Sequence, residues 1–430
     1  MVDYSERGAL VSGPPNNPAI PDRTLAVATK LRDVQAREVA ATIPVYGQMP
    51  FIPERGEGCD LITAEGRRIL DFYGGHAVAG LGYAHPELTK TIEQQARQLL
   101  FQSNAAAMGV RADAACELAA IAPPLLSRVF FVNSGAEANE NALRIACTAT
   151  GRSRILALTH GFHGRTAAAA AVTWKADATW YGFPRLPFDV DFIPRNDVAA
   201  AKEMIDDTVA AVIFEPVQGI GGAFDLSQEF VTALRTRTRR SGSLLIADEV
   251  QCGMGRSGDF FAVQSFGVQP DLMTLAKSLG GGVPCGAVLA TDELAAAQKK
   301  GSLGSTFGGG PLACAAILAV IRSIKKEKLL ANVGEREVQI RTTCVTGPVQ
   351  AIQGRGLMLG LICDRPAAEV QERLLAQNIL AGTSSDPAVL RLLPPLILES
   401  AHVERLAGAL DDIGSVKTAG SPTSHTGIAQ

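Results

Sequence analysis

Short apolar runs alternate with longer stretches of helical periodicity through most of the chain. The clearest runs cover residues 129–132, 155–158, 210–214, 244–247, 272–275 and 286–290. An uninterrupted apolar run is typical of a strand that is buried on both faces, as in a parallel sheet covered by helices. The pattern therefore predicts an α/β fold with strands at these positions.

Several of these runs are followed by a polar residue that can do chemistry. Asn133 follows the first run, Glu215 the third and Asp248 the fourth, while Lys277 lies just beyond the fifth. Because ligands of parallel sheets bind at the carboxyl ends of the strands, we expect these residues to share one crevice.

The two ends of the chain depart from this pattern. Residues 1 to about 25 and 416–430 lack hydrophobic periodicity and predict flexible tails. A helical pattern begins near Pro311, with Ile317, Ile321 and Ile324 on one face. The segment from there to about Ile413 predicts a separate lobe, which we place from residue 320 onward.

Composition narrows the class of protein. The 430 residues carry a formal net charge of -3, which gives no electrostatic attraction to nucleic acid or anionic lipid. The eight cysteines form no C-x-x-C pair and no cluster at zinc spacing, so we expect neither a disulfide nor a metal. No apolar stretch approaches ~18 residues and no basic segment leads into one. We therefore expect a soluble, cytoplasmic protein without a membrane or nucleic-acid partner.

Two small-residue loops are candidates for binding an anion. Ser134, Gly135 and Ala136 form a turn between a strand and a helix that runs to about Thr150, so backbone N–H groups and the helix dipole would favour a phosphate. The alternative is that Ser134 merely caps the helix. Thr306 lies in a second Ser/Thr/Gly loop, residues 304–310, which is weak evidence alone.

A second pair of motifs offers contacts for a planar, charged ligand. Phe162 and Arg165 lie three residues apart in a glycine-flanked loop, where a ring can stack and a guanidinium can bind a carboxylate. Asp248 closes an apolar strand, where an ionised carboxylate needs a cation or donor such as a protonated pyridine nitrogen. A core phenylalanine, a surface arginine and a structural carboxylate remain the alternatives.

Lys277 is the strongest single candidate. A lysine at the end of an apolar strand, followed by three glycines, is desolvated, and desolvation lowers the amine pKa and permits a Schiff base with an aldehyde. The commoner alternative is a lysine that reaches to the surface. Residues 253–258 match G-x-G-x-x-G, but no strand directly precedes them and no helix follows, so a dinucleotide site is disfavoured.

Taken in order, these motifs resemble the class III aminotransferases of the fold-type I pyridoxal-phosphate superfamily, from about Pro50 to Ile413. The resemblance is strongest to the acetylornithine aminotransferase branch. The motifs that carry it are Gly80–Pro86, Gly161–Thr166, Asp248–Arg256, Gly304–Gly309 and Leu390–Leu396.

The resemblance implies a large domain around a mostly parallel sheet and a smaller α+β domain built from both ends of the chain. The implied division is a tail and the first part of the small domain in 1–75, the large cofactor domain in 76–319, the rest of the small domain in 320–415 and a tail in 416–430. It also implies a homodimer with shared active sites.

The resemblance further implies how pyridoxal 5'-phosphate is held. Lys277 carries the cofactor and shuttles the proton, while Asp248 pairs with the pyridine nitrogen. The remaining contacts are Phe162 and Val250 on the ring faces, Gln251 near the phenolic oxygen, Ser134, Gly135 and Ala136 on the phosphate, and Thr306 reaching the phosphate from the other subunit.

On the substrate side, the resemblance implies that Arg165 binds the α-carboxylate. Glu215 would pair with Arg391 and move aside for a dicarboxylate such as glutamate or 2-oxoglutarate. The expected reaction moves the terminal amino group of an N-acylated basic amino acid, N-acetylornithine above others, to 2-oxoglutarate in arginine or lysine biosynthesis. N-succinylornithine, carrier-linked lysine, ornithine and 4-aminobutyrate are alternative donors.

The chain also departs from the family pattern. Small residues at Ala105-Ala106-Ala107 replace aromatic ones near the substrate entrance, Gly74-Gly75-His76 replaces a common Ser-Gly-Ile, Ala79 a frequent asparagine, and Cys147 a frequent arginine. All of these departures except Cys147 are expected near the substrate mouth, so they leave the acyl group and the substrate length open. His76 and His163 are each either active-site contacts or structural side chains, and we favour the structural role.

Overall fold

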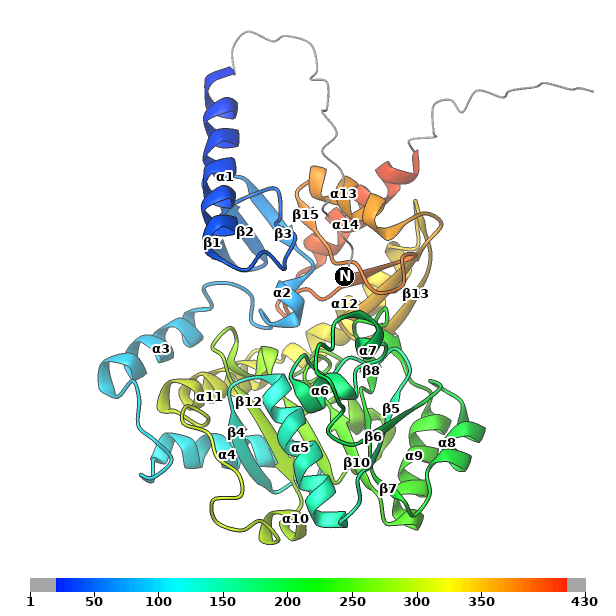
Figure 1. Ribbon diagram of the computed structural model, residues 1–430. Coiled ribbons are helices and arrows are strands. Elements are labelled where there is room, and N and C mark those ends of the chain that lie inside the picture. Colours follow the sequence, from blue (N-terminus) through cyan, green and yellow to red (C-terminus); the bar gives the residue numbers. More distant parts are fainter. Residues whose placement is uncertain (1–20, 416–430) are drawn as a thin grey trace, which may run out of the picture.

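A seven-stranded sheet forms the centre of the larger lobe in the computed structural model, which describes residues 21–415 (Figure 1). β12 runs antiparallel to both of its neighbours and the other strand pairs are parallel. In spatial order the strands are β4 (Arg128–Val132), β12 (Gly286–Ala290), β11 (Leu272–Leu275), β10 (Leu244–Asp248), β7 (Val209–Phe214), β5 (Arg154–Leu158) and β6 (Asp189–Ile193).

The structure confirms the strands expected from the apolar runs. The sequence pattern missed β6, because this strand lies at the edge of the sheet and alternates exposed and partly buried residues. Along β10, Leu245 and Ala247 pack on one face of the sheet and Ile246 on the other. Burial on both faces explains why the central strands lack polar residues until they end.

Helices cover both faces of this sheet. α5 (Gly135–Thr150) packs against β10, β11 and β12 on one face. On the other face lie α9 (Gln228–Ser241) and α11 (Pro311–Lys326), whose apolar side chains share a core with the opposite sheet residues. The other elements of this lobe are α3 (Pro86–Gln98), α4 (Gly109–Ile121), α6 (Ala167–Ala171), α7 (Ala176–Thr179), α8 (Val198–Met204), α10 (Asp292–Ala296), β8 (Val217–Gln218), β9 (Phe224–Asp225), η1 (Ala262–Phe266) and η2 (Lys277–Gly280).

The smaller lobe joins segments from both ends of the chain, as expected. β3 (Arg68–Asp71) pairs in parallel with β15 (Ile379–Leu380), which completes a four-stranded sheet with β1 (Pro53–Glu57) and β2 (Asp60–Thr63). A second, antiparallel sheet contains β13 (Val349–Arg355), β14 (Met358–Cys363) and β16 (Val389–Leu392). Its helices are α12 (Leu329–Thr343), α13 (Ala367–Ala376) and α14 (Ser400–Ser415), and α2 (Gly74–Ala77) is a short turn between the lobes.

The expected boundary at residue 320 lies inside α11, one continuous helix that contacts α3, α4 and α12. The division of the chain at that point stays a proposal. Most of the two expected tails lies outside the described residues, and α1 (Pro21–Ala41) begins at Pro21. Among residues 21–415, no helix has both the length and the apolar character needed to cross a membrane.

Candidate active site

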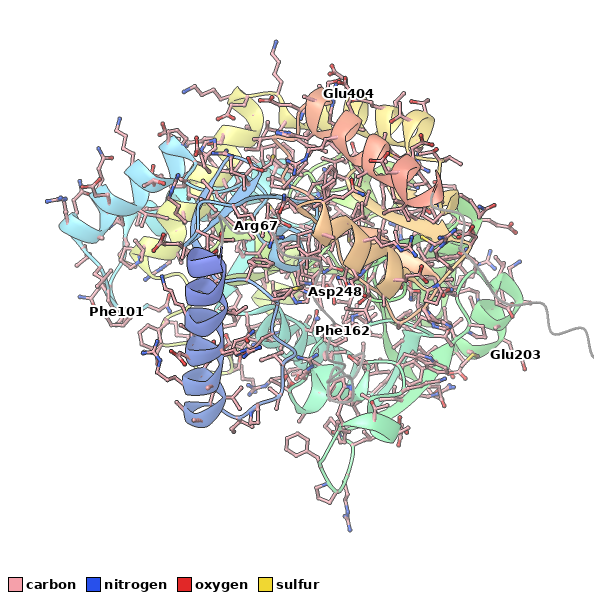
Figure 2. All side chains as sticks on the ribbon, turned by 90° about the horizontal axis from the view of Figure 1, so that it is seen from above. Arg67, Phe101, Phe162, Glu203, Asp248 and Glu404 are labelled. Carbon is pink, nitrogen blue, oxygen red and sulfur yellow. The ribbon has the colours of Figure 1, made fainter. Side chains whose placement is uncertain are left out.

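The carboxyl ends of β4, β7, β10 and β11 bring the expected residues to one edge of the large sheet. Glu215, Asp248 and Lys277 follow β7, β10 and β11, which are neighbours in the sheet. Ser134 follows β4, whose last residue pairs with the first residue of β12 at the same edge. Figure 2 shows Asp248 and Phe162 close together near the middle of the molecule. The expected residues therefore lie together along one edge of the sheet.

Asp248 is the centre of a buried hydrogen-bond network. Its Oδ2 lies 2.7 Å from Nδ1 of His163 and accepts a hydrogen bond of 2.8 Å from Asn139 Nδ2, while Oδ1 accepts from the Val250 N–H. Asn139 in turn accepts a hydrogen bond of 2.7 Å from the Thr274 hydroxyl. Asp248 is 2% exposed, so these donors replace water around its carboxylate.

The imidazole of His163 is held next to this carboxylate. Burial opposes protonation of the ring, but the hydrogen bond and the charge of Asp248, with Glu215, outweigh burial and raise the pKa of His163. The other ring nitrogen, Nε2, is buried without a hydrogen-bond partner among the described residues. This contact places His163 beside the candidate cofactor carboxylate. The structural role that the sequence favoured for His163 stays a prediction.

Lys277 lies where an amine can act as a nucleophile. It follows β11 in the left-handed region, with φ 49°, and starts the 3-10 turn η2. Burial lowers the pKa of its amine, and the nearby charges of Asp248 and Glu215 act in the opposite direction. A lowered pKa leaves more of the amine unprotonated and reactive near neutral pH.

The first turn of α5 is shaped to approach a flat, anionic ligand. A Cβ at Gly135 would come within 2.7 Å of Val250 Cγ1, so glycine is required for this close contact. Ser134 caps the helix by accepting a hydrogen bond of 3.2 Å from the Glu137 N–H, which is the alternative considered from the sequence. Capping uses the hydroxyl oxygen as an acceptor, so its hydrogen stays available to an anion. The cap and the anion site are therefore compatible.

Glu215 and Arg391 do not form the ion pair that the resemblance implied. The Glu215 carboxylate accepts hydrogen bonds from the N–H groups of Phe162, at 2.8 Å, and Gly219, at 3.4 Å. Arg391 donates to the carbonyl oxygens of Thr383 and Gly219. The backbone around Gly219 thus satisfies both side chains separately. Burial raises the pKa of Glu215 to about 7.

Arg165 is exposed and lies beside the ring of Phe162, with its guanidinium carbon 5.7 Å from the ring centroid. Its guanidinium has no hydrogen-bond or ion-pair partner among residues 21–415. Phe162 is partly exposed, so its ring is also accessible. Both side chains are therefore placed as a ring contact and an anion receptor require.

A left-handed turn borders the site. Gly74, Gly75, His76 and Ala77 all have positive φ, between 55° and 67°. A residue of the candidate site holds this turn, because the Gln251 amide donates a hydrogen bond of 3.3 Å to the His76 carbonyl. Burial, with the positive charges of Arg391, Lys277 and Arg165, lowers the pKa of His76 to about 4. Such strained backbone is concentrated at functional sites.

Comparisons with known proteins agree with this geometry. A family model described as aminotransferase class III matches residues 42–413. The acetylornithine aminotransferase of Methanocaldococcus jannaschii is 38% identical over 382 residues, which cover 86% of this chain and 95% of that protein. A Pyrococcus abyssi protein named as a LysW-aminoadipate semialdehyde/glutamate semialdehyde transaminase is 38% identical and covers 85% and 97% of the two chains. The ornithine aminotransferase structure of Toxoplasma gondii matches with a TM-score of 0.84 at 27% identity and covers 93% of this chain and 97% of that one.

The chain belongs to the class III aminotransferases.

This class III aminotransferase is a pyridoxal-phosphate-dependent transaminase, which confirms the fold, the cofactor and the enzyme class expected from the sequence. The residues present fit the cofactor. Asp248 is a buried, oriented carboxylate suited to a protonated ring nitrogen, Lys277 is an amine of lowered pKa, and the α5 N-terminus is open to a phosphate. The roles of the individual residues in binding it stay predictions.

Sequence reasoning missed Asn139 as part of the transaminase site, although a signal was present. Asn139 lies four residues after Gly135 on α5, so both face the same side of the helix. A polar residue on the buried face of a helix needs a partner, and Asp248 is that partner. Thr274, inside β11, gave no comparable signal because a single threonine is ordinary in a strand.

Thr306 lies in a loop that other residues hold firmly. Asn104 donates to the carbonyl oxygens of Ser305 and Gly308, at 3.0 and 2.9 Å, and Asn133 donates to the Ser305 hydroxyl. Thr306 itself is exposed. An exposed threonine on a rigid loop fits the expectation that it serves a second subunit of the transaminase, and that role stays a proposal.

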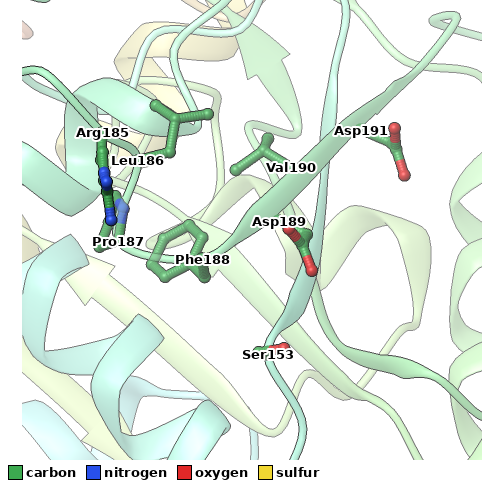
Figure 3. A pocket seen from close by; sticks show the side chains of 8 residues that line it. All are labelled: Ser153, Arg185, Leu186, Pro187, Phe188, Asp189, Val190 and Asp191. Atoms are coloured by element: carbon green, nitrogen blue, oxygen red, sulfur yellow. The ribbon is translucent and has the colours of Figure 1, made fainter.

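A surface hollow of about 750 Å³ lies away from this chemistry (Figure 3). It is lined by Ser153 and by residues 185–191, around the amino ends of β5 and β6. The transaminase site lies at the carboxyl ends of the strands, on the opposite edge of the sheet. The hollow therefore takes no part in the assigned site.

Proposed function

We propose that this transaminase moves the terminal amino group of N-acetylornithine to 2-oxoglutarate, as a cytoplasmic enzyme of arginine biosynthesis. The acetylornithine aminotransferases among its relatives support this substrate, with 38% identity to the Methanocaldococcus jannaschii enzyme. The structural observation that carries the proposal is the guanidinium of Arg165, which lies beside Phe162 and has no hydrogen-bond or ion-pair partner among residues 21–415. A free guanidinium at the mouth of the site suits the carboxylate of an N-acylated amino acid.

Pyridoxal phosphate, when bound, supplies an aldehyde for the amine and a ring that withdraws electrons. Asp248, oriented by His163 and Asn139, would keep the ring nitrogen protonated. The Lys277 amine would take a proton from the substrate carbon and return it, which its lowered pKa favours. Arg165 would bind the substrate carboxylate and fix the amine end toward Lys277. Each of these acts is carried out by a residue at one edge of the sheet.

The protonation state of Glu215 would set the charge of the substrate site in the second half-reaction, when the keto acid binds. Its pKa of about 7 means that its carboxyl group exchanges a proton near neutral pH. Gly219 lies between Glu215 and Arg391, so a shift of this backbone would free the guanidinium of Arg391. The freed guanidinium would then bind the second carboxylate of 2-oxoglutarate or glutamate.

A carrier-linked lysine or a longer acyl group is the second candidate. A hollow of about 320 Å³ lies beside the rigid 304–310 loop, with Asn104, Ala107, Met108 and Arg111 in its lining. The small side chain of Ala107 contributes to this space, and the Pyrococcus abyssi relative is named for a LysW-linked substrate. A large acyl end would require such room.

A donor panel separates these candidates. The purified enzyme is mixed with N-acetylornithine, N-succinylornithine, ornithine, 4-aminobutyrate or a carrier-linked lysine, and its visible cofactor absorbance is followed. We expect N-acetylornithine to bleach the band fastest and 2-oxoglutarate to restore it. Bleaching by unacylated ornithine or 4-aminobutyrate alone would overturn the acyl-ornithine proposal and leave the transaminase assignment intact.

We also propose a homodimer with shared active sites. Large apolar side chains are exposed on two segments, one at and after the end of α1 and the other just after α3. The helices α1 and α3 lie on the same side of the molecule in Figure 1. Such a concentration is typical of a covered interface. The exposed side chains are Val39, Ile43, Val45, Tyr46 and Met49 on one segment and Leu99, Leu100 and Phe101 on the other. The exposed ring of Phe307 packs at a tilt against that of Phe101, with 5.2 Å between the ring centroids.

A further inference from the structure

Arg165 lies against two aromatic rings and not one. Its guanidinium carbon is 5.7 Å from the centroid of Phe162 and 5.7 Å from the centroid of Trp180. The two rings are 6.5 Å apart and tilted by 48°. A guanidinium is attracted to the faces of aromatic rings, and this attraction orients the group without using its N–H donors.

The ring contacts are the means by which the structure holds this guanidinium. No hydrogen bond or ion pair of Arg165 joins it to the described part of the chain. An exposed arginine otherwise samples many rotamers, and ordering it costs conformational entropy. Two rings that fix the planar group reduce this cost before a ligand arrives, and they leave the donors free for a carboxylate.

Trp180 is itself fixed in place. Its backbone N–H donates to the Ala176 carbonyl at 2.9 Å at the end of α7. The next residue, Tyr181, is 8% exposed and packs in a small apolar cluster with Ala170 and Ala171. The side chain of Trp180 is 36% exposed, so burial of the indole is not the reason for its position.

The loop with Arg165 and the segment with Trp180 are also tied to each other. The Trp174 N–H donates to the Gly161 carbonyl at 3.0 Å, and the Thr173 hydroxyl donates to the Gly164 carbonyl at 3.2 Å. These two hydrogen bonds, and not the Arg165 and Trp180 side chains alone, therefore hold the loop with Arg165 near the segment that leads to Trp180.

We propose that Trp180 is a positioning residue for substrate carboxylates, and that it acts by holding the Arg165 guanidinium against Phe162 at the mouth of the site. The inference rests on the proposed role of Arg165 as the carboxylate receptor. On this proposal, the aromatic pair of Phe162 and Trp180 orients Arg165 for binding carboxylates. The effect would apply to any donor or acceptor whose carboxylate reaches Arg165.

Steady-state kinetics of the holoenzyme test the proposal with Trp180→Leu. We expect KM for N-acetylornithine to rise about three- to ten-fold, as loss of one cation–ring contact implies, while kcat changes little. Trp180→Phe, which keeps a ring, restores most of the loss. In an Arg165→Gln background, Trp180→Leu adds no further effect, because the group it positions is gone.

Trp174→Leu is the matched control. Trp174 is partly buried and packs against the rings of Phe192, at 5.0 Å, and His160, at 6.0 Å. It makes no ring contact with Arg165, so its replacement should leave KM unchanged. An equal rise in KM for Trp174→Leu and Trp180→Leu would overturn the proposal.

Fluorescence gives a readout that does not depend on turnover, because the chain has two tryptophans. In the Trp174→Phe holoenzyme, the remaining emission comes from Trp180. Saturating N-acetylnorvaline, which has the acyl amide and carboxylate but no terminal amine, should shift this emission. In the Trp180→Phe holoenzyme the same ligand should leave the emission of Trp174 unchanged.

The experiments distinguish a wrong role for Trp180 from a wrong choice of substrate. If N-acetylornithine proves not to be the donor, the same variants are compared on glutamate and on whichever carboxylate-bearing donor the panel identifies. A KM rise confined to Trp180→Leu and rescued by Trp180→Phe would still support the positioning role. Unchanged KM values in Trp180→Leu for every carboxylate substrate would overturn it, whatever the donor is.

Discussion

The Nδ1 atom of His163 lies 2.7 Å from Oδ2 of Asp248, and both side chains are buried. The imidazole lies next to the carboxylate that would face the cofactor ring, so it helps to fix the orientation of that carboxylate. With the cofactor bound, a chain of contacts would run from His163 through Asp248 to the ring.

Replacing His163 should therefore weaken the cofactor site without unfolding the enzyme. We expect His163→Ala to reduce affinity for pyridoxal phosphate, or kcat, by about 10- to 100-fold, as loss of an orienting partner typically does. Cofactor titration by visible absorbance measures the first effect. His160→Ala, an exposed neighbour without contact to Asp248, is the control and should behave as wild type.

Removal of the Lys277 amine should abolish the reaction. Lys277→Ala lacks the one amine of lowered pKa at the ends of the described strands, so the visible band of the covalently held cofactor should vanish and turnover should stop. Lys175→Ala, at an exposed lysine, serves as the control. Turnover by Lys277→Ala would refute the catalytic assignment.

The raised pKa of Glu215 predicts that its contribution to the stability of the folded protein falls as the pH rises. Its folded pKa is raised from 4.5 to about 7 by burial, so the folded state favours the protonated form. The stability that this preference contributes is present below pH 4.5 and is lost as the pH rises to about 7, by at most about 3 kcal/mol.

Melting curves at pH 5 and pH 8 test this sign. Between these two pH values, Glu215→Gln, which cannot ionise, should lose less of its melting temperature than wild type does. The control Glu203→Gln replaces an exposed carboxylate on α8 and should follow wild type. Identical pH profiles for wild type and Glu215→Gln would show that Glu215 does not carry the shifted pKa.

A shared active site makes a prediction about mixed dimers. Thr306→Asp would repel the phosphate in the partner's site, and Lys277→Ala would inactivate its own site, so each variant alone should be inactive. When both chains are produced together, a hybrid dimer has one site with Lys277 from one chain and Thr306 from the other. We expect activity to return in that mixture.

Activity in the mixture depends on dimers, which light scattering measures directly. Phe307→Ser, in the exposed ring pair with Phe101, should lower the dimer fraction at low protein concentration. If the two inactive chains stay inactive when combined, while hybrid dimers are shown to be present, Thr306 does not serve the partner's site.

Local sequence determined much of this structure. The central strands could be predicted because burial on both faces leaves an uninterrupted apolar signature, and α5 because Ser134 and Gly151 cap its two ends. β6 could not, because an edge strand shows alternate polar residues that also suit a loop. The hydrophobic pattern therefore predicts a strand well where consecutive residues are all buried, and poorly where buried and exposed residues alternate.

The site was predictable as a set of residues and not as a set of contacts. Asp248 and Lys277 were identified because a charged side chain at the end of a buried, apolar strand is costly unless a partner or a function accounts for it. The partners of Glu215 depended on where the Gly219 backbone lies, and those of Asp248 on the approach of a loop from another strand. These are tertiary distances, which residue types do not encode.

The parallel pair of β3 and β15 has a consequence for how the chain is made. Leu70 pairs with Ile379, and the ribosome must add roughly 300 residues after Leu70 before this partner is made. At about 5–20 residues per second, this is about 15–60 s on the ribosome with an unpaired strand edge. The nascent N-terminal sheet therefore passes through a window in which chaperones, or the wrong strand, compete for that edge.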